Sequence, residues 1–407
     1  MAYTIKRTKM NQDSVLSKQL PFLKLVPLAL AGFVAIMTET MPAGLLPEIG
    51  ASLGIKESLV GQLITLYALG SVMAAIPIIS ATLHWPRKRL LLMATVGFFV
   101  FNAITALSTS YILTLCARFI AGMAAGITWG LLIGYSRGIV HPGMVGRAIA
   151  VVGAGQPVAL AIGLPLAVWL GKVFSWEGAF WTMSALSLLL MIWMIIALPD
   201  VKGLVPQKKL SAYRVFMLGG IRRILLIMFM WILAHNILYT YISPYLSDFG
   251  LTDRVDLILL IFGVSSLIGI GIVGILIDRW LILLVKVSLL AFAMGAFSLV
   301  IANQFQPLLY FGIALWGISF GGVSTLLQKD MADRAGDNSD VAQSMFVTVF
   351  NLAIAIGGIT GGVLLEKLGA SSFPWAIILF SALIFFCLSN RKRTAPKNTQ
   401  VPVNRNI

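Results

Sequence analysis

Long apolar runs recur along this chain, and each is long enough to cross a lipid bilayer as a helix. A hydrocarbon core of roughly 30 Å needs about 20 residues at about 1.5 Å of rise each. Closed barrels also satisfy the backbone in lipid, but their strands are only about ten residues long. We therefore predict an all-α membrane protein with twelve transmembrane helices, at 25–47, 58–82, 89–109, 111–138, 146–171, 177–198, 222–247, 255–278, 283–303, 307–328, 341–365 and 373–390.

The charged residues are too few to cover a water-facing surface. They make up 11% of the chain, against about 25% in an ordinary soluble domain. The net charge of +15 is compatible with nucleic-acid binding, but the basic residues gather in the gaps between apolar runs. Cys116 and Cys387 lie within apolar runs, so neither a disulfide nor a metal site is expected. The expected partners are lipids and a small molecule, with no nucleic acid and no metal.

The basic residues alternate along the chain in a way that predicts topology. Of the 30 lysines and arginines, 25 fall in the terminal tails and in alternate gaps, and only Lys56, Lys172, Arg254 and Lys367 fall in the other gaps. Positive charge collects on the cytoplasmic side of a membrane. We therefore expect a multi-pass protein of a bacterial inner membrane with both termini in the cytoplasm.

The chain divides near its middle into two weakly similar halves. The similarity aligns Gly54 with Gly250, an offset of 196 residues. We predict two pseudo-symmetric six-helix bundles with substrate bound between them. The expected boundaries are an N-terminal tail at 1–24, bundles at 25–198 and 221–390, a central cytoplasmic loop at 199–220 and a C-terminal tail at 391–407.

Three ionisable residues lie deep inside predicted helices: Glu39, Arg118 and His235. Such groups are costly in a bilayer and mark functional sites by default. The offset of 196 also relates residue 39 to residue 235. We interpret the three as a proton-coupling site, with Glu39 carrying the proton. The alternative is an Arg118–Glu39 ion pair that holds helices together, beside a hydrogen-bonded His235.

Other polar and aromatic residues within the runs are candidates to line a substrate cavity: Gln156, Asn236, Tyr239, Asn351 and Trp129. The alternative is that the amides make hydrogen bonds between helices. A third group consists of glycines in small-residue strips that allow helices to approach closely: Gly122, Gly126, Gly153, Gly155, Gly163 and Gly361. A dinucleotide-binding loop is excluded because no strand precedes these glycines.

Several stretches resemble the drug/proton antiporters of the major facilitator superfamily. Residues 38–47 resemble the helix-one motif, 118–126 the helix-four motif, whose arginine is associated with proton coupling, and 153–166 the glycine-rich helix-five motif. Residues 239–244 and 341–352 are similar to the bacterial sugar and arabinose efflux branch. The resemblance implies the major facilitator fold and exchange of a solute against protons.

The same resemblance implies a gate of charged residues near the cytoplasmic ends of the helices. In the first half the loop retains the basic cluster Arg87, Lys88 and Arg89 but lacks the aspartate that normally precedes it. The second half keeps the pattern as Asp278 and Arg279.

We expect a monomeric secondary transporter that is not an enzyme and needs no cofactor beyond a proton gradient. Its expected activity is proton-coupled efflux of a small organic solute such as a sugar, nucleoside or drug. One alternative is proton-coupled uptake or facilitated diffusion. A distant alternative is a membrane-embedded enzyme or sensor, although the interfacial His84 and His141 have no acidic partners nearby in the sequence.

Overall fold

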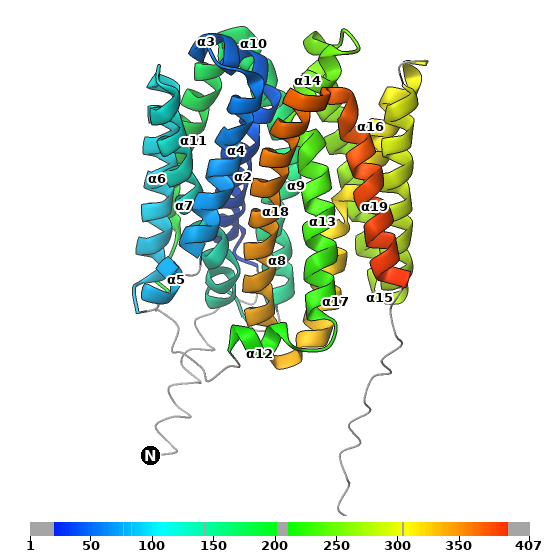
Figure 1. The fold of residues 1–407 in the computed structure, drawn as a ribbon. Coiled ribbons are helices and arrows are strands. Elements are labelled where there is room, and N and C mark those ends of the chain that lie inside the picture. Colours follow the sequence, from blue (N-terminus) through cyan, green and yellow to red (C-terminus); the bar gives the residue numbers. More distant parts are fainter. Residues whose placement is uncertain are drawn as a thin grey trace, which may run out of the picture.

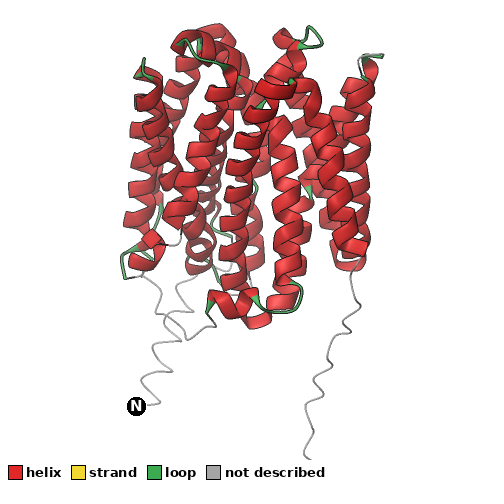
Figure 2. Ribbon diagram, in the orientation of Figure 1, coloured by secondary structure: helices red, strands yellow, loops and turns green. Residues whose placement is uncertain are grey.

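The computed structural model describes residues 20–75, 77–82, 84–141, 144–201, 211–302 and 305–389. The predicted tails lie almost wholly outside these residues, as does 202–210 of the predicted central loop. All regular structure in the described residues is helical (Figure 2). The end of the bundle that carries α12 (Ala212–Phe216) and α17 (Val323–Ala335) is called the near end; the opposite end, which carries α3 (Leu46–Leu53) and α14 (Ile242–Ser247), is the far end (Figure 1).

The first half contains six crossings, several of them interrupted by short breaks. Its helices are α2 (Phe22–Gly44), α3 (Leu46–Leu53), α4 (Glu57–Ala75), α5 (Pro77–Ala81), α6 (Arg87–Leu107), α7 (Tyr111–Gly138), α8 (Val145–Gly153), α9 (Gly155–Val158), the π-helical turn η2 (Ala159–Gly163), α10 (Leu164–Phe174) and α11 (Trp176–Ala197).

A five-residue helix, α12 (Ala212–Phe216), lies in the predicted central loop and precedes the second half. The helices that follow are α13 (Ile221–Thr240), α14 (Ile242–Ser247), η3 (Thr252–Arg254), α15 (Val255–Ile301), α16 (Pro307–Gly321), α17 (Val323–Ala335), η4 (Gly336–Asn338), α18 (Ser339–Leu368), η5 (Ala370–Ser372) and α19 (Phe373–Ser389).

Helix α15 accounts for two of the predicted crossings. Eleven helical segments of the described chain are long and apolar enough to span a membrane, and the one containing α15 has 50 residues. Its backbone leaves helical geometry at Trp280. Before that point it packs alongside α16 in the same direction, as contacts of Gly317 with Phe262 and of Gly321 with Ser266 show. After it the direction is opposite, because Gly295 contacts Trp316 while Leu299 contacts Gly312. The chain therefore reverses at Trp280, and twelve crossings confirm the predicted fold.

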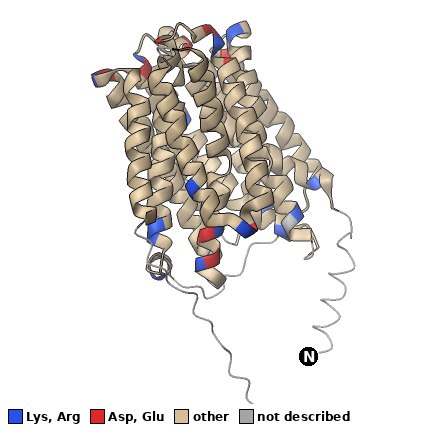
Figure 3. Cartoon of the chain, turned by 90° about the vertical axis from the view of Figure 1, so that its right-hand side faces the viewer, with Lys and Arg blue, Asp and Glu red and all other residues tan. Residues whose placement is uncertain are grey.

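Large apolar side chains cover the outside of the bundle, as lipid requires. Ile196 is 80% exposed and Ile275 is 84% exposed. Charged residues gather at the two ends and are sparse between them (Figure 3). Helix α17 continues past the predicted end at residue 328 because its polar extension is stabilised by ion pairs one turn apart, Lys329–Asp333 and Arg334–Asp330.

Glycines bring α4 and α7 into backbone contact. A side chain at Gly122 would overlap the Tyr67 carbonyl, and one at Gly126 would overlap that of Ser71. Among the other predicted packing glycines, Gly155 meets the Ala29 backbone, Gly163 meets Met37 and Phe33, and Gly361 meets the Tyr241 ring. The packing prediction is wrong for Gly153, which is exposed and has nothing within 4 Å of its would-be Cβ.

Candidate functional site

A proline within helix α2 creates an unusual acceptor in the middle of the bundle. In an α-helix the carbonyl of residue 38 accepts the N–H of residue 42, but Pro42 has no N–H. Thr38 is fully buried, so water cannot replace the missing donor. A buried backbone carbonyl needs a partner, and this one finds it on another helix.

Arg118 of α7 supplies that partner. One terminal nitrogen, Nη2, donates to the Thr38 carbonyl at 2.5 Å and lies 3.3 Å from the Glu39 carbonyl. The guanidinium carbon lies 4.8 Å from the Tyr67 ring and 5.6 Å from the Phe180 ring. Such rings attract a cation through their electron-rich faces. Carbonyls and rings, rather than a carboxylate, therefore surround this fully buried charge.

The carboxylate of Glu39 makes no hydrogen bond or ion pair with any described residue, although its side chain is only 6% exposed. The alternative of a direct Arg118–Glu39 ion pair is therefore not realised here. The nearby ionisable groups are Arg118, Tyr67 of α4 and Tyr239 of α13. The site consequently places an unpaired acid beside, but not on, a buried cation.

Two further residues fix the position of α2 against its neighbours, and neither was predicted from the sequence. Asn102 of α6 donates its amide to the Thr38 hydroxyl at 3.0 Å. The Tyr67 hydroxyl donates to the Ala35 carbonyl at 2.7 Å. Asn102 stands alone as an amide within its apolar run, which was a visible signal. The role of Tyr67 depends on a contact between helices that the sequence pattern does not show.

His235 lies in an aromatic cluster of the second half. The indole N–H of Trp316 donates to its Nδ1 at 3.0 Å. The Phe320 ring stacks on the imidazole with centroids 3.5 Å apart, and the Tyr239 ring lies at 4.9 Å. Because Nδ1 accepts a hydrogen bond, the ring is neutral in this arrangement. This geometry agrees with the alternative of a hydrogen-bonded histidine.

The predicted cavity residues lie on four helices. Asn236 of α13 and Asn351 of α18 each donate to a carbonyl one turn earlier in their own helix, at 2.9 Å. Among the described residues neither amide nitrogen bonds to another helix, and the amide oxygens are available as acceptors. Gln156 on α9 is half-buried. Trp129 on α7 packs its ring edge against Gly32 of α2.

Tyr239 connects this set to the first half. Its hydroxyl is buried, faces Thr40 and lies within electrostatic range of Glu39. It makes no hydrogen bond with a described residue. The Thr40 side chain lies beside it, and a buried hydroxyl without a well-formed hydrogen bond is costly, so this group is a candidate to contact a ligand.

The two halves are joined at the far end by a second polar cluster, centred on Tyr241. Its hydroxyl lies 2.9 Å from the Gly358 carbonyl and 3.1 Å from the Ser58 carbonyl, and it accepts from the Gln62 amide at 3.3 Å. The Ser58 hydroxyl donates to Glu366 at 2.6 Å. These bonds connect α4 with α18 and with the junction between α13 and α14, and they close the far end of the interface.

An ion pair and close backbone packing extend this closure to α10 and α15. Lys172 lies 2.8 Å from Asp256, and both side chains are partly exposed. A side chain at Gly263 would overlap the backbone of Ala161. The backbones of η2 and α15 therefore cross in direct contact, which only a glycine at residue 263 permits.

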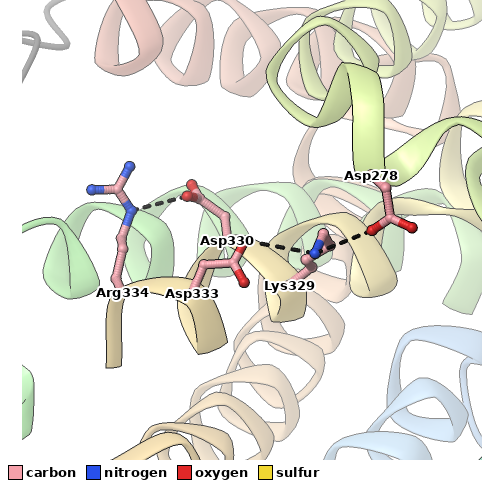
Figure 4. Close-up of polar contacts among 5 residues, drawn as sticks. All are labelled: Asp278, Lys329, Asp330, Asp333 and Arg334. Atoms are coloured by element: carbon pink, nitrogen blue, oxygen red, sulfur yellow. Dashed lines mark hydrogen bonds and ion pairs between the residues drawn. The ribbon is translucent and has the colours of Figure 1, made fainter. Parts of the chain in front are cut away.

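The predicted gating residues lie at the near end and take different partners in the two halves. In the second half Asp278 pairs with Lys329 of α17 at 3.3 Å, while Arg334 pairs with Asp330 (Figure 4). Asp278 and Arg279 were predicted from the sequence pattern, but the α17 charges were not, because they lie about fifty residues away in the chain. Arg279 is exposed.

In the first half the basic cluster interacts with backbone carbonyls. Lys88 donates to the Ile195 carbonyl at 2.8 Å. The Arg87 backbone N–H donates to the Val201 carbonyl at 2.9 Å, and its side chain is buried. Arg89 is exposed and, with Lys88 and Asp200, lines an open surface cavity of about 540 Å³.

Twelve membrane crossings in two halves, with charged and polar groups buried where the halves meet, define a transporter rather than an enzyme. The family model described as the Major Facilitator Superfamily matches residues 28–357. The chain therefore belongs to the Major Facilitator Superfamily, as the motifs of the sequence predict.

Two relatives and one solved structure illustrate this membership. The chain is 27% identical over 359 residues to the purine ribonucleoside efflux pump NepI of Shigella sonnei, covering 86% of this chain and 89% of the pump. It is 27% identical over 374 residues to a chloramphenicol efflux pump of Mycobacterium tuberculosis, covering 88% and 90%. A crystal structure of the nucleoside transporter NupG has a TM-score of 0.71 at 16% identity, covering 90% and 98%. That last likeness concerns the fold alone.

Proposed function

We propose that this transporter exports a small neutral or weakly charged organic solute in exchange for protons. The observation that carries the proposal is the Glu39 carboxylate, which is buried at the interface between the halves without a hydrogen bond or ion pair to a described residue. A carboxylate in this setting can take up a proton at one stage of the cycle and release it at another.

The same proposal assigns roles to the neighbouring residues. Arg118 tunes the proton affinity of Glu39, and the free Tyr239 hydroxyl and the amide oxygens of Asn236 and Asn351 contact the solute. Efflux is supported by the two relatives described above, both of which are named as efflux pumps. Purine ribonucleosides are the first substrates to test, and chloramphenicol is the second.

Membrane orientation and oligomeric state belong to the proposal as well. The excess of lysine and arginine in the tails and alternate gaps supports a cytoplasmic near end in a bacterial inner membrane. The proposal takes the transporter to act as a monomer, since the two halves of one chain already meet beside Glu39 and Tyr239. A fluorescent protein fused to the C-terminus should fluoresce if that end is cytoplasmic, because such reporters mature poorly after export.

Replacing Glu39 with Gln tests the proton role directly. In proteoliposomes, a pH gradient should drive solute transport by the unmodified protein and not by Glu39→Gln. The variant should still exchange labelled for unlabelled solute, since that exchange needs no net proton movement. Glu177→Gln, which removes an acid at the far end, is the matched control and should behave like the unmodified protein. Unchanged pH-driven transport in Glu39→Gln would rule the proposal out.

The sign of the pH gradient tests the direction of exchange. An exchanger accumulates solute in vesicles whose lumen is acidic, because protons leave as solute enters. A proton-coupled importer accumulates solute when the outside is acidic. A facilitator responds to neither gradient. Accumulation driven by outside acid would replace efflux with uptake as the assigned function, and no response to either gradient would replace it with facilitated diffusion.

A further inference from the structure

Helix α2 carries two prolines, and only one of them lies at the charged site. Pro27 and Pro42 are both inside the helix and both buried. Each removes an N–H that would bond to the carbonyl four residues earlier. Pro27 thereby frees the carbonyl of Leu23, near the exposed start of the helix. Pro42 frees the carbonyl of Thr38, which is fully buried and in reach of Arg118.

Arg118 has few acceptors in this position. Its Nη2 takes the Thr38 and Glu39 carbonyls, while its Nε and Nη1 are buried without a hydrogen bond among the described residues. A guanidinium offers five N–H donors and prefers a carboxylate, which it can bind with two parallel bonds. The Glu39 carboxylate belongs to the same turn of α2 as the carbonyl that Arg118 contacts, yet the two side chains are not paired.

We propose that Pro42 is a positioning residue for proton coupling: it frees the Thr38 carbonyl to hold Arg118, and so keeps Arg118 off the Glu39 carboxylate. This inference rests on the proposed function, because it assigns the state in which Glu39 is ready to bind a proton. Movement of Arg118 from the carbonyl to the carboxylate would then accompany proton release. Without Pro42, the restored N–H would compete for the Thr38 carbonyl and favour the Arg118–Glu39 pair.

The other groups facing Glu39 do not supply this control. The titratable side chains that face it are Arg118 from α7, Tyr67 from α4 and Tyr239 from α13. The Tyr67 hydroxyl is already bonded to the Ala35 carbonyl, and the Tyr239 hydroxyl faces Thr40 and is neutral, with no well-formed hydrogen bond to a described residue. Arg118 is therefore the only cation among these three groups, and its position decides how strongly the charged form of Glu39 is favoured.

An infrared titration of Glu39 tests the inference without requiring transport. The C=O stretch of the protonated carboxyl is assigned by its absence in Glu39→Gln. In Pro42→Ala it should disappear at a pH lower by about one unit or more, because an opposite charge in contact favours the ionised acid. Pro27→Ala restores an N–H to the same helix away from Arg118 and should leave the band unchanged.

A second substitution separates the lost donor from the bend that proline imposes. Pro42→Gly restores the N–H and leaves the backbone free to keep the bend, and it should move the band in the same direction as Pro42→Ala. In an Arg118→Met background neither substitution should move it. An unchanged band in Pro42→Ala and Pro42→Gly would overturn the inference, as would an equal shift in Pro27→Ala.

Transport data then separate this inference from the proposed function. The pH profile of solute exchange should move to lower pH in Pro42→Ala together with the infrared band. If the unmodified protein shows no pH-driven transport at all, proton exchange is wrong, while the band shift still decides whether Pro42 positions Arg118.

Discussion

The two halves of this transporter place very different groups at related positions. Residues 39 and 235 are separated by the offset that aligns the halves, and one is an unpaired acid while the other is a neutral imidazole within an aromatic cluster. The first half holds a buried cation on backbone carbonyls. In the second half, the cluster around His235 is held by ring stacking and one indole hydrogen bond. The repeated architecture is therefore shared, but charge at the centre is concentrated in one half.

The largest expected effect comes from the packing that encloses the charged half. In Gly122→Val, the side chain would collide with the Tyr67 backbone, which also positions a ring against Arg118. Overpacking of this kind should lower the free energy of unfolding in mixed micelles by about 3 kcal/mol. Gly153→Val, at an open position, should change it by less than about 0.5 kcal/mol. Equal losses would show that the close crossing of α4 and α7 does not hold this half together.

An intermediate effect is expected at the neutral centre of the other half. His235→Asn can keep an acceptor for the Trp316 N–H, whereas His235→Leu leaves that buried donor unpaired. The leucine variant should be less stable than the asparagine variant by about 1–3 kcal/mol, as measured by the free energy of unfolding in micelles.

The same histidine variants also test whether the halves truly differ in charge. If His235 only accepts a hydrogen bond, then His235→Asn should keep the pH profile of transport. Loss of pH dependence in His235→Asn would mean that the imidazole carries a proton, and the contrast between the halves would fail.

The smallest effect is expected where the two halves meet. Tyr241→Phe removes a hydroxyl that bonds across the interface, which should weaken far-end closure by about 1 kcal/mol. Alkylation of a cysteine placed at Thr65, in a background without Cys116 and Cys387, should then be about fivefold faster. Tyr245→Phe removes a comparable bond within the second half and should leave the rate unchanged. A similar acceleration in both variants would indicate general loosening rather than a specific closure.

The sequence predicts the crossings well because a bilayer imposes one length and one polarity on each of them. The deep positions of Glu39, Arg118 and His235 follow from the same pattern. Their partners do not. Trp316 lies 81 residues from His235, and nothing in the local pattern indicates that its N–H meets Nδ1. Gly122 and Gly153 look alike in the sequence, yet only the face of the helix on which each lies decides whether it packs.

The carbonyl that accepts from Arg118 could be predicted in part from the sequence. A proline four residues after Thr38 indicates a carbonyl without its helical N–H donor in the middle of a crossing, but it does not indicate which side chain donates to that carbonyl instead. The turn at Trp280 was predicted as a gap between two helices, and it turned out to be a reversal within almost continuous helix. The local sequence therefore indicated where the helices are irregular, at Pro42 and near Trp280. Contacts with other helices determine the consequence of each irregularity, which is a carbonyl bound by Arg118 in one case and a reversal of the chain in the other.

The Tyr241 cluster has a consequence for the medium that bathes the far end. Apart from the Ser58–Glu366 bond, its bonds join a neutral hydroxyl, a neutral amide and backbone carbonyls, so dissolved ions barely screen them. The Lys172–Asp256 pair, partly exposed at the same end, weakens as salt rises, since screening acts within about 10 Å at 0.1 M. Most of the closure at that end is therefore insensitive to ionic strength, and the opening equilibrium should stay nearly constant in dilute and in saline surroundings.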